Sequence, residues 1–251
     1  MDSWNKRAAL FGASLILVVA FVIAGYKEKP ALAQQPAKQA QQPLKGKPTE
    51  TFVALVRAHP NTLDPAIGSD NPTRKFILAV YEPLLRVRPD STELQPMLAE
   101  SWSVSPDGKT FTFKLRKEVK FHDGTELTSE AVKASFERVK KIGLGYAWTL
   151  ADVTQINTPD PRTVEIVLGR VNATFLQSMP LVFIVSPRAI KENAKGNDLA
   201  QDWFKEHEAG TGPYTLSQWV KNEQIVLSAF EAYWQGWKPN QFGKVIMRRV
   251  E

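Results

Sequence analysis

Two segments of this chain alternate apolar and polar residues on either side of a turn sequence, and this pattern limits the folds open to it. In the first, Trp102 and Val104 precede Ser105-Pro106-Asp107-Gly108-Lys109, after which apolar residues return at every second position. Proline presets φ and glycine supplies a positive φ, so residues 101–119 are predicted to form a β-hairpin. A second hairpin is expected through Thr158-Pro159-Asp160-Pro161. One face of each hairpin should enter a core.

Helical patterns alternate with these hairpins. A helix is predicted from Pro72 through Tyr81, because Phe76, Ala79 and Val80 fall on one helical face. Pro83 is expected to end this helix. A second helix should begin after Thr128, a good N-cap residue, and end before Gly143. Further elements are expected as a helix over 199–208 and strands over 51–56, 214–220, 225–229 and 244–250. Helices and hairpins without strict βαβ alternation predict an α/β (mixed α+β) fold.

The N-terminus carries the pattern of an export signal. Lys6 and Arg7 precede an apolar run from Ala8 to Gly25, and Ala31-Leu32-Ala33 provides a cleavage sequence. This order predicts a signal peptide over residues 1–33. The alternative is an uncleaved membrane anchor, since the apolar run approaches the length that spans a bilayer. On either interpretation the residues after Ala33 are exported.

A segment rich in Gln, Pro and Lys follows over residues 34–49. It lacks hydrophobic periodicity, so it cannot bury enough apolar surface to offset the entropy lost on ordering. We predict a disordered linker here, with the folded body beginning near Glu50.

Composition excludes several classes of function. The formal net charge of +6 is spread along the 251 residues, and no long block of Lys and Arg indicates nucleic-acid binding. The densest basic cluster, from Lys114 to Lys120, alternates with apolar residues as a strand would. The chain has no cysteine, which excludes disulfides, thiolate metal sites, cysteine nucleophiles and a lipid-anchoring cysteine.

Catalytic and metal-binding patterns are absent from the sequence. His59, His122 and His207 are far apart, and none has a second ligand type at helical spacing. We interpret His122 as a turn residue, and the pair Glu206 and Glu208 as the solvated face of a charged helix. No catalytic residue, metal ligand or cofactor is therefore predicted.

Aromatic residues in a loop give the clearest indication of binding. Trp148 lies in Gly145-Tyr146-Ala147-Trp148, directly after a predicted helix. Such a residue can form the wall of a ligand pocket, or it can pack in a core, and the sequence leaves both interpretations open. The remaining tryptophans in strand or turn patterns are assigned to packing: Trp102, Trp219, Trp234 and Trp237.

Four motifs, in order along the chain, resemble those of the family 5 extracellular solute-binding proteins. The longest runs from Leu98-Ala99-Glu100-Ser101-Trp102 through Phe121-His122-Asp123-Gly124. The others are Leu63-Asp64-Pro65 with Tyr81-Glu82-Pro83-Leu84, Gly210-Thr211-Gly212-Pro213-Tyr214, and Tyr233-Trp234 before Lys238-Pro239. This resemblance covers the chain from Glu50 to Glu251.

The resemblance implies a periplasmic-binding-protein (type II) fold, in which two lobes close on a ligand. It assigns residues 50–84 and 172–251 to the first lobe and residues 85–171 to an inserted subdomain rich in β-hairpins. Relatives continue for about as many residues again, so we expect the second lobe to be missing and this chain alone to bind weakly. The implied function is that of a periplasmic, monomeric binding component, which delivers a peptide or similar small solute to the membrane subunits of an ABC permease. The alternative is a membrane-anchored sensor or interaction protein that reuses the domain.

The resemblance also suggests which residues face the ligand. They leave the first strand, surround the first helix, or follow the second helix. Some have simpler interpretations, such as an exposed helix charge or a turn residue. The candidate ligand-binding residues are Ala58, His59, Pro60, Asn61, Ser69, Arg74 and Trp148.

Overall fold

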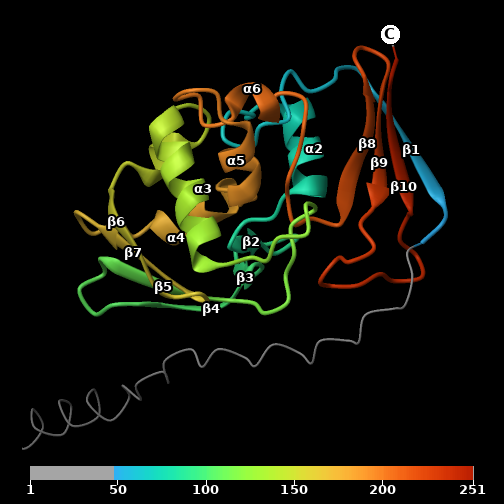
Figure 1. The fold of residues 1–251 in the computed structure, drawn as a ribbon. Helices are drawn as coiled ribbons and strands as arrows, with labels where there is room; N and C mark the ends of the chain where they lie inside the picture. Colours follow the sequence, from blue (N-terminus) through green and yellow to red (C-terminus); the bar gives the residue numbers. More distant parts are fainter. Residues whose placement is uncertain (1–47, 251) are drawn as a thin grey trace, which may run out of the picture. The chain divides into compact units, whose positions relative to one another are not determined.

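The computed structural model, which describes residues 48–250, contains two four-stranded sheets, and the two alternating segments form the first of them (Figure 1). The first sheet has the order β4-β5-β7-β6, and every neighbouring pair in it is antiparallel. Its strands are β4 (Ala99–Val104), β5 (Thr110–Leu115), β6 (Val153–Asp160) and β7 (Thr163–Leu168). Both predicted hairpins are confirmed.

The turn chemistry of the first hairpin acts as the sequence predicts. Gly108 adopts a φ of 69°, and the Asp107 carboxylate accepts a hydrogen bond from the Lys109 backbone N–H at 3.1 Å. Across the sheet, Phe113 lies opposite Val164, and both side chains are fully buried. The alternation therefore separates a core face from a solvent face.

The second sheet joins segments from the two ends of the described chain. Its order is β1-β10-β9-β8, and β1 pairs in parallel with β10. The strands are β1 (Thr51–Val56), β8 (Tyr214–Val220), β9 (Gln224–Ala229) and β10 (Lys244–Arg249). A small antiparallel pair, β2 (Leu85–Val87) and β3 (Leu94–Pro96), completes the strands.

Two longer helices are capped, the second of them at the predicted residues. The helix α2 (Asn71–Val80) begins at Asp70, whose carboxylate accepts a hydrogen bond from the Thr73 backbone N–H at 2.9 Å. The helix α3 (Ser129–Ile142) begins at Thr128 and ends at Gly143, where φ is 71°. The shorter helices are α4 (Phe175–Ser178), α5 (Pro187–Asn193) and α6 (Gln201–Phe204), and 3₁₀ turns lie at Ala147–Leu150 and Met179–Leu181.

The helix predicted over residues 199–208 is wrong in length. Only the four residues of α6 are helical, because Leu199 and Ala200 both have positive φ and cannot continue a helix upstream. The chain then leaves the helix after Phe204, where the Lys205 carbonyl accepts a hydrogen bond from the Leu63 backbone N–H at 3.1 Å.

Two hydrophobic clusters form the core. In the first, α3 packs on the β4-β5-β7-β6 sheet (Figure 1). Phe136 of α3 and Ile166 of β7 are buried in this cluster. In the second, α2 packs beside the sheet that contains β8, with Phe76 and Met247 in the same cluster. The aromatic residues after β9, with Tyr233 and Trp237 buried, form a smaller third cluster.

The predicted signal peptide and all but the last two residues of the predicted linker lie outside the described residues. Within residues 48–250, no helix has the length and apolarity needed to cross a membrane. The boundaries expected near residues 85 and 171 stay a prediction.

Candidate functional site

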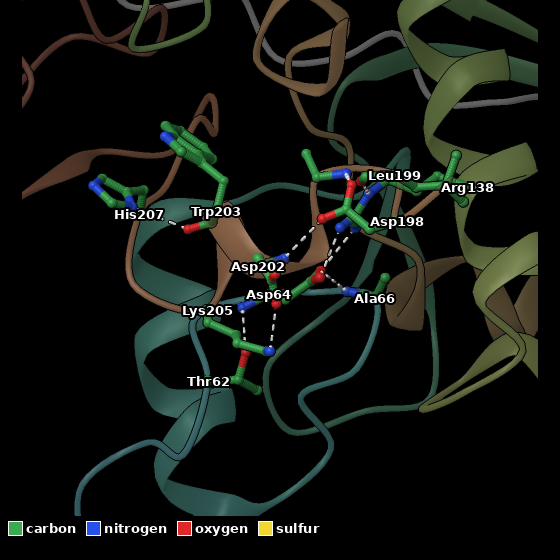
Figure 2. Close-up of polar contacts among 11 residues, drawn as sticks. Thr62, Asp64, Ala66, Arg138, Asp198, Leu199, Asp202, Trp203, Lys205 and His207 are labelled. Atoms are coloured by element: carbon green, nitrogen blue, oxygen red, sulfur yellow. Dashed lines mark hydrogen bonds and ion pairs between the residues drawn. The ribbon is translucent and has the colours of Figure 1, made fainter. Parts of the chain in front are cut away.

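A buried ion pair fixes the chain between β1 and α2. Both carboxylate oxygens of Asp64 accept hydrogen bonds from the guanidinium of Arg138 on α3, each at 2.7 Å (Figure 2). Neither side chain is exposed by more than 2%. The Arg138 Nε–H also donates to the Leu199 carbonyl at 2.8 Å, and the guanidinium lies 4.5 Å from the centre of the Phe204 ring. The Leu-Asp-Pro motif therefore holds its loop to α3 and α6.

The same aspartate shapes the loop that follows it. Its carboxylate accepts a hydrogen bond from the Ala66 backbone N–H, and its carbonyl accepts one from the Gly68 backbone N–H, both at 2.9 Å. This loop touches the loop after α3 at Gly145, where a Cβ atom would lie 2.7 Å from the Ala66 carbonyl oxygen. Glycine is required at position 145 because the backbones meet and φ there is 54°.

Three candidate residues lie on these touching loops or on α2. The Arg74 Nη1 on α2 donates a weak hydrogen bond to the Tyr146 hydroxyl at 3.5 Å, and the guanidinium lies 5.7 Å from the centre of the Tyr146 ring. Two positions further, Trp148 exposes 68% of its surface, which excludes the core-packing interpretation. Ser69 is exposed in the loop that contacts Gly145. These three residues form an aromatic and cationic surface. The buried Asp64–Arg138 pair fixes the loop that contacts Gly145 next to this surface.

The remaining candidate residues lie away from this surface, at or next to a hollow. His59, Pro60 and Asn61 line a hollow of about 310 Å³ together with residues of the β8–β9 turn and the segment after α6. Ala58 precedes them and is exposed. The structure thus places Ser69 and Trp148 on neighbouring loops and Arg74 on α2 beside them, while residues 59–61 line a hollow that none of these three shares.

A buried carboxylate that sequence reasoning missed joins three of the sequence motifs. Glu82 accepts hydrogen bonds from the Thr211 hydroxyl at 2.9 Å, the Tyr233 hydroxyl at 2.8 Å and the Trp234 indole N–H at 2.8 Å. Burial raises the pKa of Glu82 to about 7, although these three hydrogen bonds and the nearby His122 lower it. The sequence marked Glu82 only through its place in the Tyr-Glu-Pro-Leu motif. Its burial could not be predicted, because its hydrogen-bond partners lie far along the chain.

The prediction that His122 is a turn residue is confirmed, whereas the interpretation of Glu206 and Glu208 as a solvated helix face is corrected, because α6 ends at Phe204 and the Glu208 side chain is buried. His122 lies in the predicted turn, yet its Nδ1 and the Glu208 carboxylate are 2.6 Å apart, with side-chain exposures of only 5% and 7%. Its Nε2 lies 2.9 Å from the Gly212 carbonyl oxygen. Burial lowers the pKa of His122, but the hydrogen bond and charge of Glu208 and the Gly212 carbonyl outweigh it, so the pKa is raised. Glu206 does face solvent.

Within the described part of the chain, no group of three His, Asp or Glu side chains is placed to hold a metal ion. The buried side chains of Asp64, Glu82 and His122 all have hydrogen-bond partners. No hydrogen bond in the described chain links them to the surface formed by the half-buried Arg74 and the exposed Trp148. What this surface offers is therefore stacking, apolar contact and a positive charge, which are means of binding a small molecule.

The arrangement of sheets and loops is that of one lobe of a periplasmic binding protein. The binding protein AgaA of A. tumefaciens R10, solved with agropinic acid, superimposes with a TM-score of 0.71 at 30% identity, over 80% of this chain and 40% of that one. DppA of Helicobacter pylori, solved with the peptide STSA, gives a TM-score of 0.71 at 27% identity, over 81% and 43%.

The family model for bacterial extracellular solute-binding proteins, family 5, matches residues 93–251, and the chain belongs to this family. Among its relatives, the probable D,D-dipeptide-binding periplasmic protein DdpA of Escherichia coli K12 is 38% identical over 199 residues. The glutathione-binding protein GsiB of Escherichia coli O1:K1 is 31% identical over 192 residues. The chain spans 38% of the length of the first relative and 35% of the second. The predicted family and fold class are thus confirmed.

Proposed function

We propose that this chain contributes one lobe to the periplasmic substrate-binding component of an ABC importer for peptides or similar small solutes. The component captures its ligand without covalent change and delivers it to the membrane subunits of the transporter. The single observation that carries the proposal is the exposed Trp148, on a loop that Gly145 and the Asp64–Arg138 pair hold in place.

The physical reason is the cost of exposing and fixing such a residue. Tryptophan offers a large apolar surface with few rotatable bonds, so a fixed and exposed ring binds ligand at a low entropic cost. Arg74, held beside Tyr146, adds a cation that can pair with a ligand carboxylate. One lobe covers only one side of a ligand, so binding by this chain alone should be weak.

The test is a nuclear magnetic resonance titration of the 251-residue chain with a panel of unlabelled dipeptides. We expect the Trp148 indole signal to shift in a saturable way with at least one member of the panel. Trp148→Ala should abolish the shifts of neighbouring loop amides. The matched control is Val171→Ala, which removes a similarly exposed apolar side chain from the segment between β7 and α4 and should leave the response intact. Shifts that avoid residues 66–74 and 144–148 altogether would refute the assignment.

A further inference from the structure

Two residues that line the hollow between the end of β1 and the β8–β9 turn carry buried polar atoms without partners. His59 is only 9% exposed, and neither of its ring nitrogens has a hydrogen-bond partner among residues 48–250. The indole nitrogen of Trp219, on β8, is likewise buried and unpartnered, and both residues line the same hollow. Leaving a buried donor unsatisfied costs about 1–3 kcal/mol, so two such residues at one hollow call for a ligand.

The hydrogen-bonding chemistry of these nitrogens limits the chemical class of ligand that could bind here. An indole nitrogen is only a donor, and an imidazole presents at least one N–H donor. The Asn61 side chain, exposed at the edge, makes no hydrogen bond within the described residues and adds two further donors. A group with two acceptor oxygens in one plane, such as a carboxylate, matches this set of donors.

The charges around the hollow favour a single negative charge. Lys205 and Lys221 line it, but each is already paired, Lys205 with Asp202 at 2.6 Å and Lys221 with Glu206. Glu206 itself lines the hollow, so the lining carries one net positive charge, which Asp202 beside Lys205 offsets from outside the lining. A dianion such as phosphate would therefore place more uncompensated charge in the hollow than a monocarboxylate.

A side chain with a flexible stem lies over the indole ring of Trp219. The Lys221 ammonium lies 5.7 Å from the centre of the Trp219 ring, while its side chain is 63% exposed. Exposed lysines reorient within nanoseconds, so this cover can swing aside at little cost. The ion pair with Glu206 is also exposed, and such pairs contribute about 0–1 kcal/mol.

We propose that this hollow binds the carboxylate of a small monoanionic molecule, with the Trp219 indole N–H and the His59 imidazole as its donors. Lys221 moves off the indole ring to admit the ligand. The site shares no residue with the Ser69, Arg74 and Trp148 surface, so it is a second site that does not depend on the proposed solute-binding function.

The experiment follows two signals of the 251-residue chain, the Trp219 indole N–H and the His59 ring C–H, during titration with sodium acetate. With only three histidines in the chain, the His59 signal can be assigned by single substitution. We expect both signals to shift and to saturate at millimolar acetate. Trp219→Phe keeps the ring and removes the donor, so the acetate affinity followed at His59 should fall about tenfold.

Two controls separate this site from general effects. Val171→Ala changes an exposed side chain outside the hollow, and it should leave the acetate response unchanged. Sodium chloride at the same ionic strength should give no saturable shift. The proposal is overturned if the signals do not move, if chloride or phosphate acts as strongly as acetate, or if Trp219→Phe leaves the affinity unchanged, as it would where a buried water alone satisfies the nitrogens.

Discussion

Glu82 accepts hydrogen bonds from side chains that lie 129, 151 and 152 positions later in the chain. These donors belong to the Gly-Thr-Gly-Pro-Tyr and Tyr-Trp motifs, so three of the four motifs that mark the family meet at one buried carboxylate. Their role here is structural. The sequence identified each motif but could not show the meeting point, since a hydrogen bond across 150 residues has no local pattern.

The stability of the fold should fall as pH rises from 5 to 8. The folded-state pKa of Glu82, about 7, lies above its ordinary value of 4.5, so its stabilising contribution is complete below pH 4.5 and is lost as pH rises through 7. His122, whose pKa is also raised, acts in the same direction from its ordinary value of 6.5 upward. The Glu82 shift alone corresponds to at most about 3 kcal/mol.

Urea unfolding at pH 5 and pH 8 measures this effect, and Glu82→Gln isolates it. Glutamine has nearly the same shape and does not titrate, so the fall in unfolding free energy across this range should be smaller in the variant. The range avoids the carboxylates with lowered pKa, such as Asp123, whose contribution is lost only in more acidic solution. An equal fall in both proteins would show that Glu82 does not titrate there.

Breaking the Asp64–Arg138 pair should be among the most damaging single changes. Removing one partner leaves a buried charge without compensation, so Arg138→Met and Asp64→Asn are each expected to cost about 3–5 kcal/mol. The double variant should cost less than the sum of the two, because it buries no unpaired charge. Urea midpoints of the four proteins give the coupling energy, and a sum that is simply additive would contradict the pairing.

At the scale of elements, local chemistry predicted what it controls. Both hairpins, the two capped helices and the strands of the second sheet follow from alternation, turn residues and caps within a few positions. The prediction of a helix over 199–208 was wrong in length because tertiary contacts decide the conformation there. The Asp198 carboxylate accepts a hydrogen bond from the Ala200 backbone N–H at 2.9 Å, and the Leu199 carbonyl accepts one from Arg138. For the candidate ligand residues, the sequence could name exposed loops, but it could not divide them between two surfaces.

Close approach of one segment to α2 makes a glycine essential. Gly212 donates its backbone N–H to the Val80 carbonyl at 2.9 Å, and a Cβ atom there would lie 2.6 Å from the Val80 carbonyl carbon. We expect Gly212→Ala to destabilise the fold by about 1–3 kcal/mol, because the obstacle is backbone and cannot turn away. Gly169→Ala is the control, since its nearest neighbour is the methyl group of Thr154 at 3.1 Å. Equal thermal midpoints for the two variants would contradict this reasoning.

At the scale of the whole described body, one short segment belongs to both hydrophobic clusters. Val182 and Ile184 are buried in the cluster around α3, while Phe183 and Val185 are buried in the cluster around α2. Alternate residues of an extended chain point to opposite sides, so this segment lies between the two cores and packs into both; it is called the shared wall. The Ser135 hydroxyl on α3 helps to hold this segment in place, since it accepts a hydrogen bond from the Val185 backbone N–H at 3.0 Å.

A shared wall predicts that the two cores unfold together. Ile184→Ala removes contacts from the cluster around α3, and Phe183→Ala removes them from the cluster around α2, each at a cost of about 2–5 kcal/mol. If the cores are coupled, each variant lowers the whole transition, and amide exchange rises in both clusters by the same factor. Hydrogen exchange measured by mass spectrometry reads the two clusters separately. Independent domains would instead confine the rise for Ile184→Ala to the first cluster and for Phe183→Ala to the second, and the predicted subdomain would then fold on its own.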